Sequence, residues 1–292
     1  MFKHVVVGID GDTHGRDAIA LARVLGAADA ELTFAHVHPA MTAAAMTAAA
    51  VTPGTASDAR PSCPEEAHDL LVEAIKESGS DAWMRWIGSP NVGSGLHAIA
   101  DQVGADLLVV GGSDRGRLTR TLLGNPTTET MAEADCPVAV APLGYASASH
   151  TIRRVGVAYD ESPASEGAMS LGKRLAEDLG AELSAFGVVS PPKGPLEPRR
   201  HQIERSVLAL AHARERIAEH EGFDAQVACG RTVEELSGYS NTVDILVAGA
   251  RGAGSLALLV HPSTTAALTR VVHCPLLVLT KGARVREAAV AG

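Results

Sequence analysis

Two acidic residues, each at the end of a short apolar run, are the first candidates for chemistry in this sequence. Asp10 ends "HVVVGID" (4–10), and Asp160 ends "RVGVAYD" (154–160). A carboxylate at the end of a strand accepts hydrogen bonds from neutral donors, among them the hydroxyl groups of a ribose. The same position also suits the cap of a following helix, so the pattern leaves a binding role and a capping role open.

Glycines follow a second apolar run in a comparable place. "DLLVVGG" (106–112) ends in Gly111 and Gly112, and "DILVAGA" (244–250) contains Gly249. Glycine lets backbone N–H groups approach a phosphate closely, and the start of the next helix adds a partial positive charge. A glycine after a strand also marks a plain turn, so phosphate binding is one of two interpretations.

The loop after the first glycine pair is rich in arginine. "GGSDRGRLTRTLLGNP" (111–126) holds Arg115 and Arg117, which suit the oxygens of a phosphate. The chain as a whole has a formal net charge of −9, which argues against sequence-independent binding of nucleic acid. The sequence therefore favours a small phosphate ligand over a polynucleotide.

The other polar clusters give weaker signals. His36 and His38 share a strand face, but His-x-His without a carboxylate is weak evidence for a metal site. Cys136 and Cys274 precede prolines at matching positions and are best interpreted as small buried residues. The sequence contains no H-E-x-x-H segment, no G-x-S-x-G segment and no Walker lysine loop. We therefore expect no metal site and no enzyme activity.

A unit that occurs twice must position the acids and the glycines. Four segments recur in the same order: 4–10 with 154–160, 30–38 with 181–189, 106–112 with 244–250, and 135–142 with 273–280. Such self-similarity predicts two copies of one structural unit. The first copy carries extra residues rich in alanine, threonine and proline at 39–64, which we interpret as a surface excursion.

Each copy alternates strand and helix patterns. Helical spacing predicts helices at 16–27 and 164–180, the second starting at Ser162–Pro163, and an amphipathic helix with mixed charges at 199–220. Further strands are expected at 82–87, 106–111, 138–142, 224–229, 244–249 and 276–280. Alternating strands and helices predict parallel β-α-β units. In such sheets a ligand binds beyond the carboxyl ends of the strands, where the strand order reverses.

The order of these motifs resembles that of tandem universal stress proteins. Each half of such a protein opens with a V-x-V-x-x-D-x-S-like strand and turn, and later carries G-x-x-G-x9-G-[ST] and C-P-V-x-V-V. The segments "VVGIDGD", "VGVAYDES", "GARGAGSLALLVHPS", "DCPVAVAP" and "HCPLLVL" fit this order, and "GGSDRGRLTRTLLGN" resembles a variant of the loop. The resemblance covers residues 3–281, and the last residues are expected to form a tail.

The resemblance implies two tandem Rossmann-like α/β domains, at 1–143 and 151–282, each with a five-stranded parallel sheet of order 3-2-1-4-5. It implies a cytoplasmic, non-catalytic stress-response regulator that binds ATP or a related adenine nucleotide, with Mg²⁺ as a companion, although some members bind none. It also implies that the halves pair through their last strands as an intramolecular pseudo-dimer, with a homodimer left open. No apolar run of about 18 residues is present, so no membrane span is expected.

The nucleotide contacts of the family fall on matching positions in both halves. Asp10 and Asp160 match the acid beside the nucleoside, and Val37 and Val188 match the residue whose backbone meets adenine. The phosphate-loop positions are Gly111, Gly112, Arg115, Gly116, Gly124 and Asn125 in the first half, and Gly249, Gly252, Gly254, Ser263 and Thr264 in the second.

Both loops depart from the family pattern near their ends. In the first half the final Gly-Ser becomes Gly124-Asn125, and Pro126 follows without an N–H group. In the second half Pro262 replaces the final glycine. The first half is therefore the favoured nucleotide site. A nucleotide-free scaffold and a slow nucleotide hydrolase stay open as alternatives.

Overall fold

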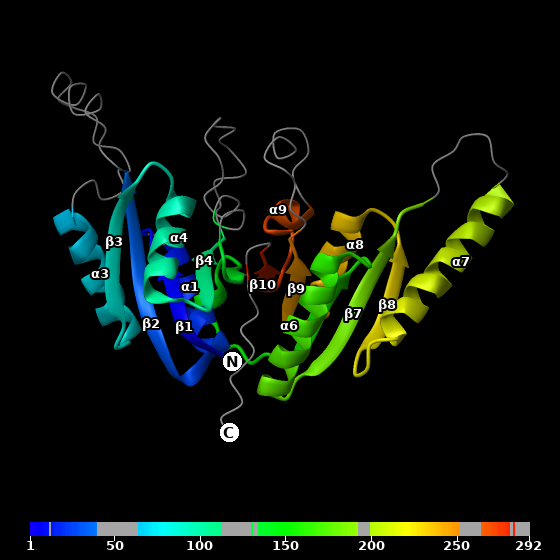
Figure 1. Ribbon diagram of the computed structural model, residues 1–292, viewed down its shortest axis with the longest axis horizontal. Coiled ribbons are helices and arrows are strands. Elements are labelled where there is room, and N and C mark those ends of the chain that lie inside the picture. The colour runs from blue at the N-terminus through cyan, green and yellow to red at the C-terminus, as the bar shows by residue number, and fades with distance from the viewer. Residues whose placement is uncertain are drawn as a thin grey trace, which may run out of the picture. The chain divides into compact units, whose positions relative to one another are not determined.

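The computed structural model describes residues 1–11, 13–39, 64–112, 130, 134–191, 199–250, 264–280 and 283. These residues form two α/β units, one of residues 2–148 and one from residue 149 onward. The excursion expected at 39–64 and most of the expected tail lie outside the described ranges. Each unit is drawn with its element labels in Figure 1.

Five parallel strands form the sheet of the first unit, in the order β3-β2-β1-β4-β5 (Figure 1). They are β1 (Phe2–Gly8), β2 (Gly26–Pro39), β3 (Trp83–Ser89), β4 (Leu107–Gly111) and β5 (Val138–Ala141). The central strands β1 and β4 pair in register, with Val5 beside Leu107 and Val7 beside Val109. All four of these side chains are fully buried, which explains the uninterrupted apolar runs in the sequence. The predicted order 3-2-1-4-5 is confirmed.

Helices cover both faces of this first sheet. They are α1 (Thr13–Leu25), α3 (Pro64–Ser78) and α4 (Val92–Val103), and a short 3₁₀ turn, η2 (Tyr145–Ser147), follows β5. Leu96 of α4 packs beside Gly8, whereas Gly15 of α1 packs on the next residue of the chain, Ile9. Successive residues of a strand face opposite sides, so α1 and α4 lie on opposite faces.

The second unit repeats this sheet in the order β8-β7-β6-β9-β10. Its strands are β6 (Arg154–Tyr159), β7 (Glu182–Val189), β8 (Asp224–Cys229), β9 (Ile245–Gly249) and β10 (Leu276–Leu279). The pairing of β6 with β9 places Val157 beside Val247, as β1 pairs with β4 in the first unit. Two copies of one strand order confirm the internal repeat.

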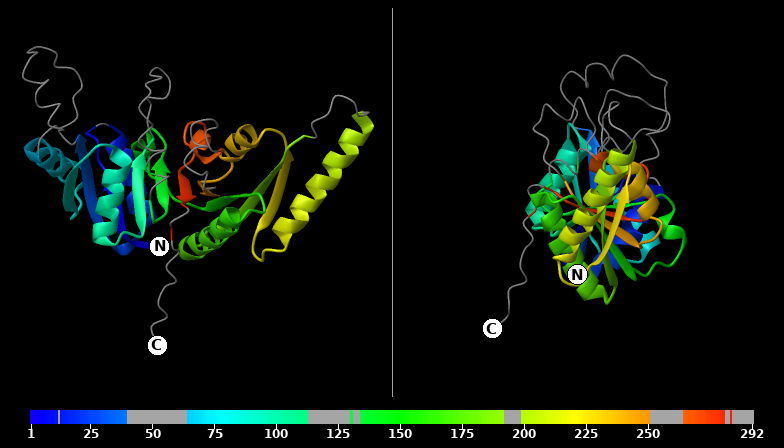
Figure 2. Two further views of the ribbon diagram at one scale, coloured as in Figure 1. Left: turned by 45° about the horizontal axis from the view of Figure 1, so that its top comes forward. Right: turned by 90° about the vertical axis from the view of Figure 1, so that its right-hand side faces the viewer.

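The helices of the second unit also lie on both faces of their sheet (Figure 2). They are α6 (Pro163–Leu179), α7 (Arg199–Ala218), α8 (Thr232–Tyr239) and α9 (Thr264–Leu268). Ser162 accepts a hydrogen bond from the Ser165 N–H at 3.2 Å and Pro163 opens α6, which confirms the predicted helix start. On the opposite face Tyr239 of α8 stacks on Phe186, with ring centroids 4.4 Å apart.

The predicted bounds of the first helix were wrong at both ends. The helix expected at 16–27 begins at Thr13 and ends at Leu25. It ends there because Gly26 already pairs with Phe2 in the sheet, ahead of a register shift that brings His4 beside Glu31.

Among the described residues, no helix combines the length and the apolar character that crossing a bilayer requires.

Candidate functional site

Asp10 and Gly111 lie at the carboxyl ends of the neighbouring strands β1 and β4, and His14 in the first turn of α1 adjoins both. The His14 Nδ1 atom is 3.9 Å from the Asp10 Oδ2 atom. A Cβ atom built on Gly111 would lie 2.5 Å from the His14 carbonyl oxygen. The fold therefore brings the acid and the glycine of the first half to one place, at the position where open α/β sheets bind ligands.

The two strand-end glycines make a close packing contact with a helix. The Cβ position of Gly111 is filled by the backbone of His14, and that of Gly249 is filled by the backbone of Ala164 in the first turn of α6. A side chain at either position would overlap backbone atoms, so only glycine fits. Helix packing is therefore a sufficient reason for Gly111 and Gly249, apart from any ligand.

The N–H groups that follow these glycines are already used inside the sheets. The Gly112 N–H donates to the Ala141 carbonyl at 2.8 Å, and the Ala250 N–H donates to the Leu279 carbonyl at 2.9 Å. Donors for a phosphate would therefore come from residues farther along each loop. Those candidates, which are Arg115, Gly116, Gly124, Asn125, Gly252, Gly254 and Ser263, lie outside the described residues, and Thr264 begins α9.

Asp160 holds the turn that precedes α6 in the second half. Its Oδ1 atom accepts a hydrogen bond from the Ser162 N–H at 3.1 Å, and its own N–H donates to Ser165 Oγ at 3.3 Å. These contacts bind the acid to the turn that starts α6. Asp160 thus forms an Asx turn ahead of α6, whereas the cap of that helix is Ser162.

The imidazole of His14 has no counterpart in the second half, where Ala164 packs on the strand-end glycine in its place. The His14 Nε2 atom is buried and has no hydrogen-bond partner in the described part of the chain. Leaving a buried polar atom without a partner costs about 1–3 kcal/mol. A ligand that supplied a partner to His14 would recover part of this free energy.

The residue after each acid takes a left-handed backbone conformation. Gly11 has φ 87°, and the equivalent Glu161 has φ 62°. The strained Glu161 is held from α7, because the Arg216 Nε atom donates to its carboxylate at 3.3 Å. The end of α7 is thereby connected to the turn that carries Asp160.

A second contact joins the end of α7 to the same turn. The Tyr159 hydroxyl donates to Glu166 at 2.7 Å, and His220 lies against both side chains. Burial and the hydrogen bond to Glu166 raise the pKa of Tyr159 to about 12, so the phenol stays protonated at neutral pH.

The two valines expected to meet adenine lie near the ends of the second strands. The Val37 side chain is buried, and α4 comes so close that a Cβ atom on Gly95 would lie 2.6 Å from Val37 Cγ1. Val188 in β7 precedes two residues that border a hollow of about 470 Å³, a volume within the range of small-ligand sites. The hollow is lined by Val189, Ser190, Arg205, Ser206, Leu208 and Ala209.

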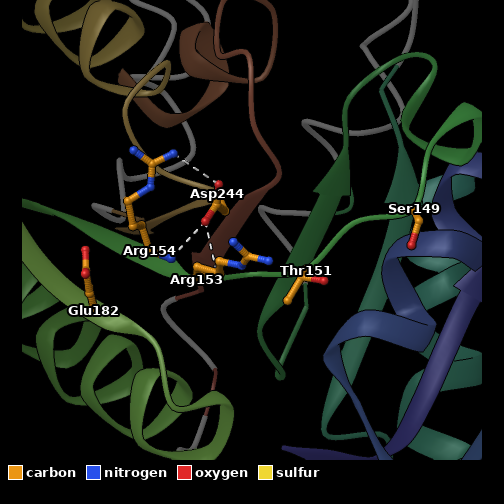
Figure 3. A pocket seen from close by; sticks show the side chains of 6 residues that line it. All are labelled: Ser149, Thr151, Arg153, Arg154, Glu182 and Asp244. Carbon is orange, nitrogen blue, oxygen red and sulfur yellow. Dashed lines mark hydrogen bonds and ion pairs between the residues drawn. The ribbon is translucent and has the colours of Figure 1, made fainter.

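Aspartates at the opposite edge of each sheet have a structural role that sequence reasoning missed. The Asp106 carboxylate accepts the N–H groups of Lys3 at 2.9 Å and His4 at 3.0 Å, where β1 begins. Figure 3 shows the equivalent Asp244, which accepts the N–H groups of Arg153 and Arg154, both at 2.9 Å. The signal was present, because both copies of the repeated segment open with aspartate.

Asp244 lines a pocket of about 480 Å³ with Ser149, Thr151, Arg153, Arg154 and Glu182 (Figure 3). The strand β6 begins at this pocket and ends at Tyr159, just before Asp160, at the far edge of the sheet. The pocket is therefore distinct from the site that the sequence predicts.

In the described part of the chain no three or more metal-binding side chains come together. His36 is buried, and its Nδ1 atom lies 2.7 Å from the Ile9 carbonyl oxygen.

Asp17 is a second residue that sequence reasoning missed. It is buried on α1, and its two carboxylate oxygens accept the N–H groups of Gly144 at 2.8 Å and Ala146 at 2.7 Å. Tyr145, which lies between these donors, is also buried. The segment between the two expected domains, 144–150, is thus fixed at its start to the first unit.

Comparison with known proteins identifies the family of the chain. A family model described as the universal stress protein family matches residues 1–142 and 151–280. The universal stress protein Rv2005c of Mycobacterium tuberculosis is 30% identical over 184 residues, an alignment that covers 60% of this chain and 61% of that protein.

Two solved structures share the fold over nearly the whole chain. A universal stress protein from Archaeoglobus fulgidus is 16% identical with a TM-score of 0.61, over 96% of this chain and 98% of its own. A putative universal stress protein from Pseudomonas aeruginosa is 15% identical with a TM-score of 0.57, over 95% of this chain and 93% of its own. At these identities the likeness concerns the fold alone.

Proposed function

The chain belongs to the universal stress protein family, and on this premise we propose that it binds one ATP or related adenine nucleotide in its first half. The bound nucleotide serves as a signal and not as a substrate, so the protein acts as a non-catalytic regulator in the cytoplasm. The observation that carries the proposal is the meeting of Asp10, His14 and Gly111 at the carboxyl ends of β1 and β4.

The residues of the first half fit the parts of a nucleoside. Asp10 provides a carboxylate for the ribose hydroxyls, and the buried Nε2 atom of His14 offers a further polar contact. Val37 offers its backbone to the base, since its side chain is buried against α4. The phosphates, with any Mg²⁺ they bring, are assigned to the arginine-containing loop that follows Gly112, as the sequence indicates.

The second half supports this assignment by contrast. There the acid already accepts the Ser162 N–H in the turn before α6, and alanine replaces the histidine. Pro262 also removes a backbone donor from the second loop. These differences favour a single nucleotide per chain, in the first half.

A nucleotide-free scaffold is the second candidate, and one observation favours it. In both halves the first N–H group after the strand-end glycine pairs with the last strand, at Gly112 and at Ala250. Packing alone therefore accounts for the glycines that suggested a phosphate loop. In this alternative the protein works through its surfaces, and the predicted pairing of its halves through their last strands stays a prediction.

Equilibrium dialysis with labelled ATP separates the two candidates. The repeat provides a matched pair of variants, Asp10→Ala and Asp160→Ala. We expect one saturable site in the wild type, loss of that site in Asp10→Ala and its retention in Asp160→Ala. The absence of saturable binding below about millimolar ATP would reject the nucleotide proposal and leave the scaffold.

The non-catalytic part of the proposal has its own measurement. We expect wild-type protein to release no phosphate from ATP beyond the rate of buffer alone over hours. Steady release that Asp10→Asn abolishes would contradict this and support a slow hydrolase. An unchanged rate in Asp10→Asn would identify a contaminating enzyme.

A further inference from the structure

Helix α7 exposes three large apolar side chains in its first half. Ile203, Val207 and Leu208 are 63%, 58% and 70% exposed. Their spacing places them on one helix face together with Ala211. Nearer the end of the helix Ile217 is fully buried beside Gly187 of β7. The exposed patch of Ile203, Val207, Leu208 and Ala211 is therefore not part of the buried core of the unit.

The first half contains a natural control for this surface. Helix α3 occupies the same place in its unit, between the second and third strands. Its exposed positions carry only charged side chains and histidine, at Glu65, Glu66, His68, Asp69, Glu73, Lys76 and Glu77. The fold thus does not require apolar residues on the outside of this helix. The patch on α7 needs a reason other than the fold of the unit.

The start of α7 receives little support from its own sheet. The left view of Figure 2 and Figure 1 both show the first turns of α7 diverging from β8. The only buried residue that the described part of α7 contains is Ile217, near its end. Most of the stability of a helix in a protein comes from tertiary packing of one of its faces. A partner that covers the patch would stabilise these turns.

Charged residues flank the patch in a pattern that complements itself. Arg200 precedes the patch and Glu204 follows its first residue, Ile203, whereas Arg214 and Glu215 follow its last residue on the same side. We propose that two copies of this chain associate through α7, with the helices antiparallel about a twofold axis beside Leu208. The proposal concerns a surface of the second half and does not depend on nucleotide binding in the first.

The antiparallel arrangement pairs opposite charges at both ends of the patch. With the twofold axis beside Leu208, Glu204 of one copy lies about two residues, or ~3 Å along the helix axis, from Arg214 of the other. Arg200 of one copy lies about one residue from Glu215 of the other, and the twofold axis repeats both pairs. In a parallel arrangement each charged residue would instead lie beside the same residue of the other copy, and like charges would meet. The charges therefore select the antiparallel orientation.

Sedimentation velocity across a concentration series measures this association. The double substitution Val207→Glu and Leu208→Glu removes the patch at exposed positions, so the fold is retained. We expect it to weaken association by about tenfold or more, as truncation of central interface residues does. Lys76→Glu, an equally exposed change on α3, is the matched control and should leave association unchanged.

Charge exchange tests the orientation. Glu204→Arg alone and Arg214→Glu alone should each weaken association, and the double variant should restore it. Circular dichroism checks that Glu204→Arg retains the helix, since Glu204 also pairs with Arg200 at 3.2 Å in its own chain. Failure of the double variant to restore association would overturn the antiparallel arrangement.

Cross-linking tests the position of the axis. In a background with Cys63 and Cys229 replaced by serine, Leu208→Cys should form a disulfide between copies, and Glu73→Cys on α3 should not. The proposal is overturned if the wild type sediments as a single chain at every concentration. It is equally overturned if the Val207→Glu, Leu208→Glu variant associates as the wild type does.

Discussion

The carbonyl oxygen of His14 lies 2.5 Å from the point that a Cβ atom on Gly111 would occupy. The first turn of α1 therefore rests directly on the last residue of β4, and the same contact recurs between Ala164 and Gly249 in the second unit. In the first unit this contact also sets the position of the imidazole that adjoins Asp10. A packing requirement and the candidate site thus share one contact.

Substitution of the strand-end glycines tests this contact. Gly111→Ala and Gly249→Ala should each lower the free energy of unfolding by about 1–3 kcal/mol, because the new methyl group meets backbone atoms that cannot rotate away. Urea unfolding followed by circular dichroism measures the loss. Gly238→Ala in α8 is the control, since nothing lies within 4 Å of its Cβ position. Equal stability of all three variants would show that the contact is looser than described.

Much of this architecture could be predicted from the sequence. The repeated segments predicted two units, and the strand order, the start of α6 and the helix at α7 are confirmed. The strand order was implied by the resemblance to a family, whereas the two helix features follow from local patterns, which are helical spacing and the Ser-Pro start. The bounds of α1 could not be found in this way, because the pairing of Gly26 with Phe2 is a contact between distant residues.

The site was predicted less completely, for a physical reason. A glycine after a strand looks the same in the sequence whether it makes room for a phosphate or for a helix. Only the close approach of His14 to Gly111 and of Ala164 to Gly249 shows that helix packing requires these glycines. Asp17 gave no signal, because its partners are the backbone N–H groups of Gly144 and Ala146. Every residue type except proline carries such a group, so no residue pattern marks the contact. Its equivalent in the second half is not an acid, so the repeat did not reveal it either.

Asp17 should fix the segment after β5. In Asp17→Asn one side-chain oxygen is replaced by an amide donor that faces a backbone N–H, so we expect a loss of about 1–3 kcal/mol of stability. Hydrogen exchange should show faster exchange at the amides of Gly144 and Ala146. The exposed Asp29→Asn serves as the control. Unchanged protection of both amides in Asp17→Asn would contradict this role.

The buried cysteines should be inert in the folded protein. Burial raises the pKa of the Cys136 and Cys274 thiols from 9.0 to about 12, so neither forms a reactive thiolate near neutral pH. Iodoacetamide at mildly alkaline pH, followed by peptide mass mapping, should label the exposed Cys229 and spare these two. Labelling of Cys136 at the rate of Cys229 in native protein would refute their burial.

The same thiols predict how stability changes at alkaline pH. The unfolded chain releases these protons near pH 9, whereas the folded protein holds them to about pH 12. Deprotonation therefore stabilises the unfolded state first, and stability present at neutral pH should fall as the pH rises through this interval. Urea midpoints across the interval measure the slope. Replacing Cys136 and Cys274 with alanine should flatten it, and Cys229→Ser should not.

The central claim, one nucleotide bound beside Asp10, is tested most directly by native mass spectrometry of the protein as purified from cells without added ligand. We predict a species heavier than the chain by the mass of one adenine nucleotide, which Asp10→Ala loses and Asp160→Ala keeps. A wild-type spectrum that shows only the bare chain, and that stays so after incubation with ATP, would contradict the claim.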